Sequence, residues 1–333
     1  MSGVPASGAD QGTGAGSGAG AGSGAGVGLP RRVVVRAPGK INLSLAVGAV
    51  DARGYHVLET LFHAVDLAET VTAVPADELS LTVDSAVPGE IPLDGRNLAL
   101  RAAEQLRAEH DVSAGAELHI RKEVPVAGGM GGGSADAAAT LVALDRLWGL
   151  GLSEAQLRAH AARLGADVPF ALRGRTALGR GNGGDLSSVL TAMHPTWLLA
   201  VPGGHLSTPE VYRRHDEIAA ARGRTLAPAP RIDPRQLEAL ASGDLELLGR
   251  TLHNDLQDAA LALHPGLEPV LAAALREGAL GALVSGSGPT IAVLVADEAQ
   301  ARGVAAALQS AGLVESCLIA EGNAPGARVL EES

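Results

Sequence analysis

Five glycines crowd into the six positions from Gly128 to Gly133, and this stretch constrains the chain more than any other. The apolar run before it, Leu118–Val126, predicts a strand, and Ser134 is a suitable N-cap for a helix over Ala135–Trp148. A strand that leads through glycines into a helix N-terminus gathers backbone N–H groups and the positive end of the helix dipole, which suits a phosphate. No Lys-Ser or Lys-Thr pair follows the glycines, so this is not a Walker A loop. A flexible turn before an alanine-rich helix is the alternative.

The overall charge limits the partners of such a loop. The chain has a net charge of -11 and a pI of about 5.4, which argues against a nucleic-acid or anionic membrane surface but allows a small anion in a local pocket. Cys317 is the single cysteine, so no internal disulfide forms, and no Cys/His cluster has zinc spacing. No apolar run approaches the length of a membrane span. We therefore expect a cytoplasmic protein that acts on a small molecule.

Two residue types are conspicuously rare. Among 26 basic residues only Lys40 and Lys122 are lysine, and all the others are arginine. A lysine retained in this background suggests a position that needs a compact ammonium rather than a guanidinium fork. The two tyrosines, Tyr55 and Tyr212, are similarly isolated, although with so few events chance is the alternative.

The chain order predicts alternating strands and helices. Residues 1–30 are a low-complexity Gly/Ala/Ser-rich tail that we expect to be disordered. The following patterns predict a strand over 31–37 broken at 38–40, its resumption over 41–47, a strand pair over 58–73, and helices over 97–109 and 153–164. The Gly- and Arg-rich stretch 173–188 indicates a domain boundary, giving domains over 31–188 and 189–327.

The second half continues the alternation. A strand is expected over 197–201, and Thr208 is a plausible N-cap with Pro209 in the first turn of a helix. Helices are expected over 237–250, 267–277 and 298–311, and a tight turn over 285–290 joins strands at 282–284 and 291–295. This order predicts an α/β or α+β protein.

Three segments, in order, resemble the signature motifs of the GHMP kinases, a superfamily of small-molecule kinases. They are Ala37–Leu43 (APGKINL), Pro125–Ala138 (PVAGGMGGGSADAA) and Val284–Thr290 (VSGSGPT). Within the superfamily, KINL at 40–43, RGYH at 53–56, GGGSAD at 131–136 and GADVP at 165–169 are most similar to the 4-diphosphocytidyl-2-C-methyl-D-erythritol kinases. The resemblance covers about residues 31–325. Its departures are Met130, where leucine is usual, and Gly39, where alanine is common.

The resemblance implies an α+β fold with two domains, the first like ribosomal protein S5 domain 2 and the second ferredoxin-like, with the active site between them. It implies ATP-dependent phosphorylation of the C2 hydroxyl of 4-diphosphocytidyl-2-C-methyl-D-erythritol in the non-mevalonate isoprenoid pathway. Asp167 would be the general base, and Lys40 would keep it ionised and stabilise the incipient alkoxide. Without the resemblance, both would be assigned as ordinary charged residues, Asp167 at a helix N-terminus.

The resemblance also assigns binding residues. ATP would contact the loop and two further residues: Pro125, Val126, Ala127, Gly128, Gly129, Met130, Gly131, Gly132, Gly133, Ser134, Ala135, Asn97 and Lys122. The substrate would contact Asn42, Tyr55, His56, Asp167, Thr208, Tyr212, Gly286 and Ser287, with the two tyrosines stacking on cytosine. Mg²⁺ is expected from the chemistry, with Ser134 as the only candidate protein ligand. For several of these residues, structural roles are the alternative: a turn amide for Asn42, core or rim packing for the tyrosines, an N-cap for Thr208, and a hairpin turn for Gly286 and Ser287.

Two other functions stay open at this point. Another GHMP kinase, such as a homoserine kinase, is disfavoured by RGYH at 53–56 and by Tyr212, because its substrate carries no base to stack. A catalytically inactive GHMP-like binding protein is disfavoured because both Lys40 and Asp167 are present. We expect a monomer or weak homodimer that binds neither nucleic acid nor membrane.

Overall fold

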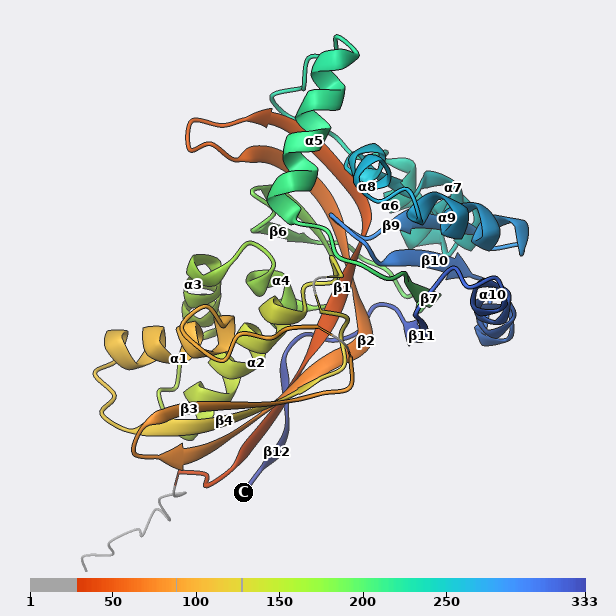
Figure 1. The fold of residues 1–333 in the computed structure, drawn as a ribbon. Coiled ribbons are helices and arrows are strands. Elements are labelled where there is room, and N and C mark those ends of the chain that lie inside the picture. Colours follow the sequence, from red (N-terminus) through yellow and green to blue (C-terminus); the bar gives the residue numbers. More distant parts are fainter. Residues whose placement is uncertain (1–28, 88, 127) are drawn as a thin grey trace, which may run out of the picture.

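The computed structural model describes residues 29–333 except 88 and 127, and it is built on two β-sheets flanked by helices (Figure 1). The expected α+β class is therefore confirmed. Most of the tail assigned to residues 1–30 lies outside the described residues, as does Ala127 of the glycine loop. In the part of the chain that is described, no helix is long and apolar enough to cross a membrane.

The first sheet has the strand order β12-β1-β2-β4-β3, with β8 added to β1 and β5 and β6 added beyond β2. Its strands are β1 (Val33–Val50), β2 (His56–Ala76), β3 (Leu79–Ser85), β4 (Gly115–Lys122), β5 (Thr176–Gly181), β6 (Asp185–Ser188), β8 (His253–Asn254) and β12 (Arg328–Glu332). The helices of this half are α1 (Leu98–Glu109), α2 (Gly132–Leu147), α3 (Glu154–Leu164) and α4 (Val168–Arg173). Helix α2 packs against β1 and β2 over an apolar core rich in alanine, valine and leucine.

Strands β1 and β2 are much longer than their sequence patterns predict. The expected break at Pro38–Lys40 is wrong: the strand continues through this segment, and only its register with β2 shifts between Pro38 and Gly39. A proline has no N–H for the ladder, and a bulge accommodates it without ending the strand. The strand pair expected over 58–73 is likewise a single strand, β2. Paired with each other, β1 and β2 extend from the end of the sheet near β12 to a hairpin beside α5 (Thr208–Ala221) (Figure 1).

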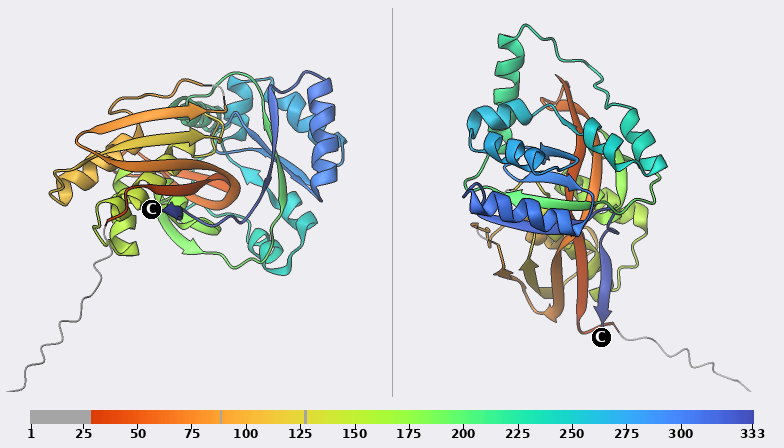
Figure 2. Two further views of the ribbon diagram at one scale, coloured as in Figure 1. Left: turned by 90° about the horizontal axis from the view of Figure 1, so that it is seen from below. Right: turned by 90° about the vertical axis from the view of Figure 1, so that its right-hand side faces the viewer.

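The second sheet has the order β11-β7-β10-β9, from β7 (Thr196–Val201), β9 (Gly281–Val284), β10 (Ile291–Val295) and β11 (Ser316–Glu321). Its helices are α5 (Thr208–Ala221), α6 (Arg235–Ser242), α7 (Leu245–Thr251), α8 (Gln257–Leu263), α9 (Leu267–Arg276) and α10 (Glu298–Ser310). Apolar residues of α9 and α10 cover one face of this sheet, while α6 and α7 pack with the other face and with β1 (Figure 2). The single helix expected over 237–250 is thus two helices, separated at Gly243, which has a positive φ of 79°.

Two later segments of the chain are added to the first sheet. The Gly- and Arg-rich stretch at 173–188 contains β5 and β6, which extend this sheet from β2. At the other end of the chain, β12 returns to pair with β1, so that Val33 lies opposite Glu332 and Val35 opposite Val329.

Candidate active site

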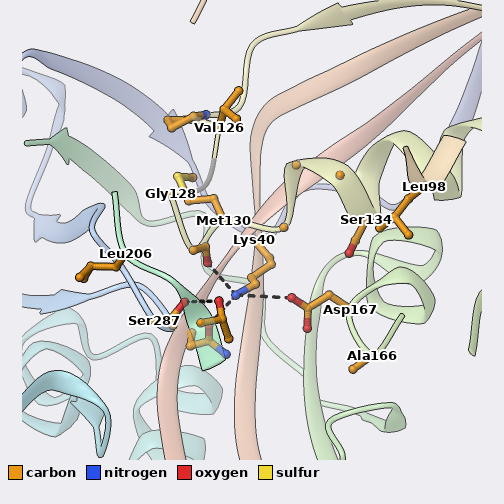
Figure 3. A pocket seen from close by; sticks show the side chains of 18 of the residues that line it. Lys40, Leu98, Val126, Gly128, Met130, Ser134, Ala166, Asp167, Leu206 and Ser287 are labelled. Carbon is orange, nitrogen blue, oxygen red and sulfur yellow. Dashed lines mark hydrogen bonds and ion pairs between the residues drawn. The ribbon is translucent and has the colours of Figure 1, made fainter. Parts of the chain in front are cut away.

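A cavity of about 570 Å³ lies where the glycine loop meets the turn between β9 and β10. Its volume is in the range of small-ligand pockets. Figure 3 shows Lys40 near its centre, with Asp167 on one side and Ser287 on the other. The three segments that resemble family motifs therefore converge on one pocket.

Lys40 is held on three sides. Its Nζ donates to Asn42 Oδ1 at 2.8 Å and to the Gly129 carbonyl at 2.7 Å, and its backbone N–H donates to the Met130 carbonyl at 2.9 Å. The residue is only 7% exposed. An ordinary solvated surface lysine is therefore excluded, and the ammonium has a fixed position beside the glycine loop.

Asp167 stands at the N-cap position of α4, directly after the turn at Gly165, and its Oδ2 lies 3.7 Å from Lys40 Nζ. Its side chain makes no capping hydrogen bond to the helix, and 31% of it is exposed in the pocket. The carboxylate is thus free to meet a ligand, with an ammonium next to it.

The glycine loop enters α2 earlier than the sequence predicts. The strand before it ends at Lys122 instead of Val126, and the helix begins at Gly132 after Gly131, which has a left-handed φ of 71°. Ser134 is therefore not the N-cap; it lies in the first turn, where its hydroxyl faces the pocket (Figure 3). The N–H groups of a first helical turn have no helical acceptors, so this end of α2 can bind an anion.

Most residues assigned to ATP line this pocket. They are Asn97, Lys122, Pro125, Val126, Gly128, Gly129, Met130, Gly131, Gly132, Gly133 and Ser134. Ala135 is completely buried behind them. Asn97 lies on the wall with both ends of its amide used, because Oδ1 caps the Ala99 N–H at 2.9 Å and Nδ2 donates to the Pro92 carbonyl at 2.8 Å. Its structural role is to shape this part of the wall.

Lys122 belongs to a buried cluster of three charged residues under the start of α2. Its Nζ lies 2.7 Å from both Glu69 Oε1 and Asp136 Oδ2. Burial, together with the charge of Asp136, raises the pKa of Glu69 to about 7 despite the lysine. Burial also raises the pKa of Asp136. For Lys122, burial alone would lower the pKa, but the charges of the two neighbouring carboxylates outweigh burial and raise it. Both carboxyl groups thus resist ionisation around this lysine.

The end of the pocket assigned to the substrate carries hydroxyl and amide groups. Asn42 accepts from Lys40 and donates through Nδ2 to Thr60 Oγ1 at 2.7 Å, so it orients the lysine and is not a turn amide. Thr208 is the first residue of α5, and Ser207 occupies the N-cap position, which corrects the expected capping role. The Thr208 hydroxyl instead lies 2.8 Å from the Ser287 hydroxyl on the pocket wall.

The two tyrosines occupy very different environments. Tyr212 lines the pocket, and burial together with the charge of Asp167 raises its pKa. The imidazole of His56 stacks behind it, with ring centroids 5.3 Å apart and planes inclined by 23°. His56 Nδ1 donates to the Gly48 carbonyl at 2.7 Å. Tyr55, on the turn between β1 and β2, is 67% exposed and is not part of the pocket lining.

Three residues of this region were not found from the sequence. Thr60 lines the pocket and holds Asn42, Glu69 completes the lysine cluster, and Asn254 supports the turn after β9. The sequence does contain a signal for Glu69. Glu69, Val71 and Ala73 occupy every second position along this part of β2, so the three side chains lie on the same, buried face of the strand. An acidic side chain on that face needs a buried partner. Thr60 and Asn254 leave no comparable signal, since each acts across a contact distant in the chain.

Comparison with known proteins agrees with this geometry. The model of the GHMP kinases N terminal domain matches residues 97–175, and that of the GHMP kinases C terminal region matches residues 236–313. A 4-diphosphocytidyl-2-C-methyl-D-erythritol kinase from Rhodococcus jostii is 47% identical over 307 residues, covering 92% of this chain and 97% of that protein. Another from Mycolicibacterium gilvum is 50% identical over 299 residues, covering 90% and 92%.

Solved structures give the same relationship. A crystal structure of 4-(cytidine 5'-diphospho)-2C-methyl-D-erythritol kinase superposes with a TM-score of 0.71 at 32% identity, covering 87% of this chain and 99% of that one. A homoserine kinase from Cytophaga hutchinsonii superposes with a TM-score of 0.70, but at 21% identity it shows only a shared fold. The chain therefore belongs to the 4-diphosphocytidyl-2-C-methyl-D-erythritol kinase family of the GHMP kinases.

Proposed function

We propose that this protein transfers the γ-phosphoryl group of ATP to the C2 hydroxyl of 4-diphosphocytidyl-2-C-methyl-D-erythritol, a step of the non-mevalonate pathway to isoprenoid precursors. The observation that carries the proposal is the Lys40–Asp167 pair, 3.7 Å apart in a pocket bordered by a glycine-rich helix N-terminus. Phosphoryl transfer requires little more of a protein than an aligned hydroxyl and compensation of charge.

In this reaction each charged group has one task. Asp167 accepts the hydroxyl proton while the hydroxyl oxygen bonds to the γ-phosphorus and the bond to the leaving ADP oxygen breaks. Lys40 compensates the negative charge that develops on the attacking oxygen, and its hydrogen bonds to Asn42 and the Gly129 carbonyl keep the ammonium in place. The N–H groups at the start of α2 hold the phosphates of the departing nucleotide.

The donor set of this site fits a magnesium ion only loosely. Within the described ranges no group of three or more His, Cys, Asp or Glu side chains is placed to hold a metal. Mg²⁺ in kinases takes much of its coordination from nucleotide phosphates and water, so few protein ligands suffice. We propose Ser134, whose hydroxyl faces the pocket, as a protein ligand for Mg²⁺ bound with ATP.

Recognition of the cytidine end is assigned to the aromatic side of the pocket. Tyr212, braced by the stacked ring of His56, offers a fixed face for a planar base. Tyr55 is proposed to cover the opposite face of the base from the exposed turn between β1 and β2. Asn42, Thr208, Gly286 and Ser287 line the pocket near Lys40 and are proposed to contact the substrate there.

We further propose that the division into domains lies near residue 188, with a second domain to about residue 327. The second sheet, β7 and β9–β11, lies within that range, whereas β5 and β6 before it extend the first sheet. We place the reaction in the cytoplasm, with the protein acting as a monomer or weak homodimer.

Turnover with purified substrates tests the assignment. ATP consumption should be stimulated by 4-diphosphocytidyl-2-C-methyl-D-erythritol and not by homoserine. Asp167→Asn keeps the shape of the side chain but removes the base, so kcat should fall by about 10²–10⁴-fold with substrate affinity retained. Stimulation by homoserine alone would overturn the substrate, and near-normal kcat in Asp167→Asn, with chemistry rate-limiting, would leave Asp167 a structural carboxylate.

A further inference from the structure

The turn between β9 and β10 lies directly against Lys40. A Cβ atom placed on Gly286 would lie 3.2 Å from Lys40 Nζ and 3.3 Å from Asn42 Oδ1, so the backbone of the turn packs against this pair without a gap. The Ser285 hydroxyl donates to the Gly129 carbonyl at 3.3 Å, and Lys40 Nζ donates to the same carbonyl oxygen. A shift of this turn therefore displaces the ammonium or its acceptor.

Asn254 holds this turn through its side-chain amide. Its Nδ2 donates to the Val284 carbonyl at 2.8 Å and to the Gly286 carbonyl at 2.7 Å, and so spans the two ends of Ser285. Its Oδ1 accepts from the Leu256 N–H at 2.9 Å. Two carbonyl acceptors face one end of the Asn254 amide, and an N–H donor faces the other end. Only one orientation of the amide, with Nδ2 toward the carbonyls, therefore satisfies all three hydrogen bonds. The residue is 6% exposed, so water cannot replace these bonds.

The backbone around Asn254 ties the turn to the strand that carries Lys40. Strand β8 pairs in parallel with β1, so that His253 lies opposite Ser44 and Asn254 opposite Leu45. The amide thus connects two parts of the pocket, β1 and the turn after β9, through one rigid side chain.

We propose that Asn254 is a positioning residue for phosphoryl transfer, which holds the Ser285–Gly286 backbone against Lys40 and so fixes the ammonium beside Asp167. This inference rests on the proposed kinase function for its kinetic consequence, but the contact that it describes exists without substrate. Loss of the two Nδ2 bonds leaves two buried carbonyls without a donor, and the turn relaxes to find new partners.

Hydrogen exchange of the full-length protein without ligands tests the structural half. Asn254→Ala should speed exchange in the 284–290 turn and in the 128–133 loop. The matched control is Gln257→Ala, because Gln257 Oε1 accepts from the Val284 N–H at 3.0 Å and touches the same strand end without reaching the turn. The control variant should speed hydrogen exchange of the Val284 amide and leave exchange in the glycine loop unchanged. Unchanged exchange of both segments in a folded Asn254→Ala would overturn the proposal; Asn254→Ser replaces alanine if that variant does not fold.

Kinetic measurements test whether Asn254 influences the reaction by positioning Lys40. Asn254→Ala should lower kcat by about 10- to 100-fold, the cost of a small misplacement of a catalytic group, with KM for ATP changed less than threefold. In a Lys40→Met background the same substitution should lower kcat less than about threefold, because both changes remove one function. A full, multiplicative loss in that background would overturn the positioning role.

The Asn254→Asp variant separates the contribution of the Nδ2 donor from that of the Oδ1 acceptor. Asn254→Asp keeps the acceptor for the Leu256 N–H but presents oxygen to two carbonyls, so it should be at least as slow as Asn254→Ala. Wild-type turnover in Asn254→Asp would show that the Nδ2 bonds are dispensable and would refute the inference. If the wild type does not phosphorylate the proposed substrate at all, the proposed function fails while the exchange experiment still decides the role of Asn254.

Discussion

Replacing Glu69 by glutamine should remove most of a pH dependence of stability between pH 5 and pH 8. Glu69 is completely buried on β2, beside Lys122 and Asp136, and its pKa rises from an ordinary 4.5 to about 7. Glu123 donates its N–H to the Glu69 carboxylate. Between pH 4.5 and 7 the unfolded chain has lost this proton while the folded chain retains it, so the free energy of unfolding falls as pH rises.

The two pKa values of Glu69 set the magnitude. The interval from 4.5 to about 7, at about 1.4 kcal/mol per pKa unit, corresponds to a total of roughly 3 to 4 kcal/mol, most of which is lost between pH 5 and pH 8. Urea unfolding of the wild type and of Glu69→Gln over this range measures the difference. The glutamine variant should lack this loss, because its amide does not titrate.

Glu59→Gln is a matched control, since Glu59 is a second buried glutamate on the same strand. Burial raises the pKa of Glu59, but the Ile232 N–H and the guanidinium groups of Arg180 and Arg231 outweigh burial and lower it. It therefore stays ionised from pH 5 to pH 8, and Glu59→Gln should keep the wild-type pH dependence. Identical pH curves for the wild type and Glu69→Gln would refute the assignment of the proton to Glu69.

Three further predictions concern the pocket. Gly132→Val should abolish ATP binding measured by calorimetry. A Cβ atom there would lie 2.9 Å from Glu69 Oε1, so the added side chain should displace the start of α2, where the phosphates are proposed to bind. Unchanged ATP affinity in a folded variant would contradict the assignment of the phosphate site to this loop. Tyr212→Ala and Tyr55→Ala should each weaken substrate binding by about 1–3 kcal/mol with ATP affinity retained, and normal substrate affinity in both would contradict base stacking. Lys122→Met should lower the free energy of unfolding at pH 8 by about 3–5 kcal/mol, because it leaves two carboxyl groups buried without a cation; a loss below 1 kcal/mol would show that the cluster is open to water.

The parts of the molecule that sequence predicts well are those whose signals are local. Ser153 and Gln156 form the complete capping box of α3, and the helix ends at Leu164 as predicted. The turn at 285–290 also lies between the two expected strands. Lys40 and Asp167, more than 100 residues apart in the chain, were paired only through the resemblance, and the distance between them comes from the structure.

The parts that it predicts poorly depend on contacts across the chain. Pro38 interrupts an alternating pattern, but pairing with β2 carries the strand past it through a bulge. Thr208 has the residue type of an N-cap, yet it begins the helix itself and its hydroxyl meets Ser287 from a different element. Asn254 leaves no local signal of its contact with the turn, because the two carbonyls to which its Nδ2 donates are 30 and 32 residues away.

The return of β12 to β1 has a consequence for the order of folding on the ribosome. Val33, Val34 and Val35 emerge among the first residues of the first sheet, whereas their partners on β12 are made last. Until then this side of β1 is an unpaired apolar edge, of the kind that recruits strands from other chains. Nascent or prematurely terminated chains that stop before Arg328 should therefore aggregate or engage chaperones, even though every residue of the pocket has already been synthesised.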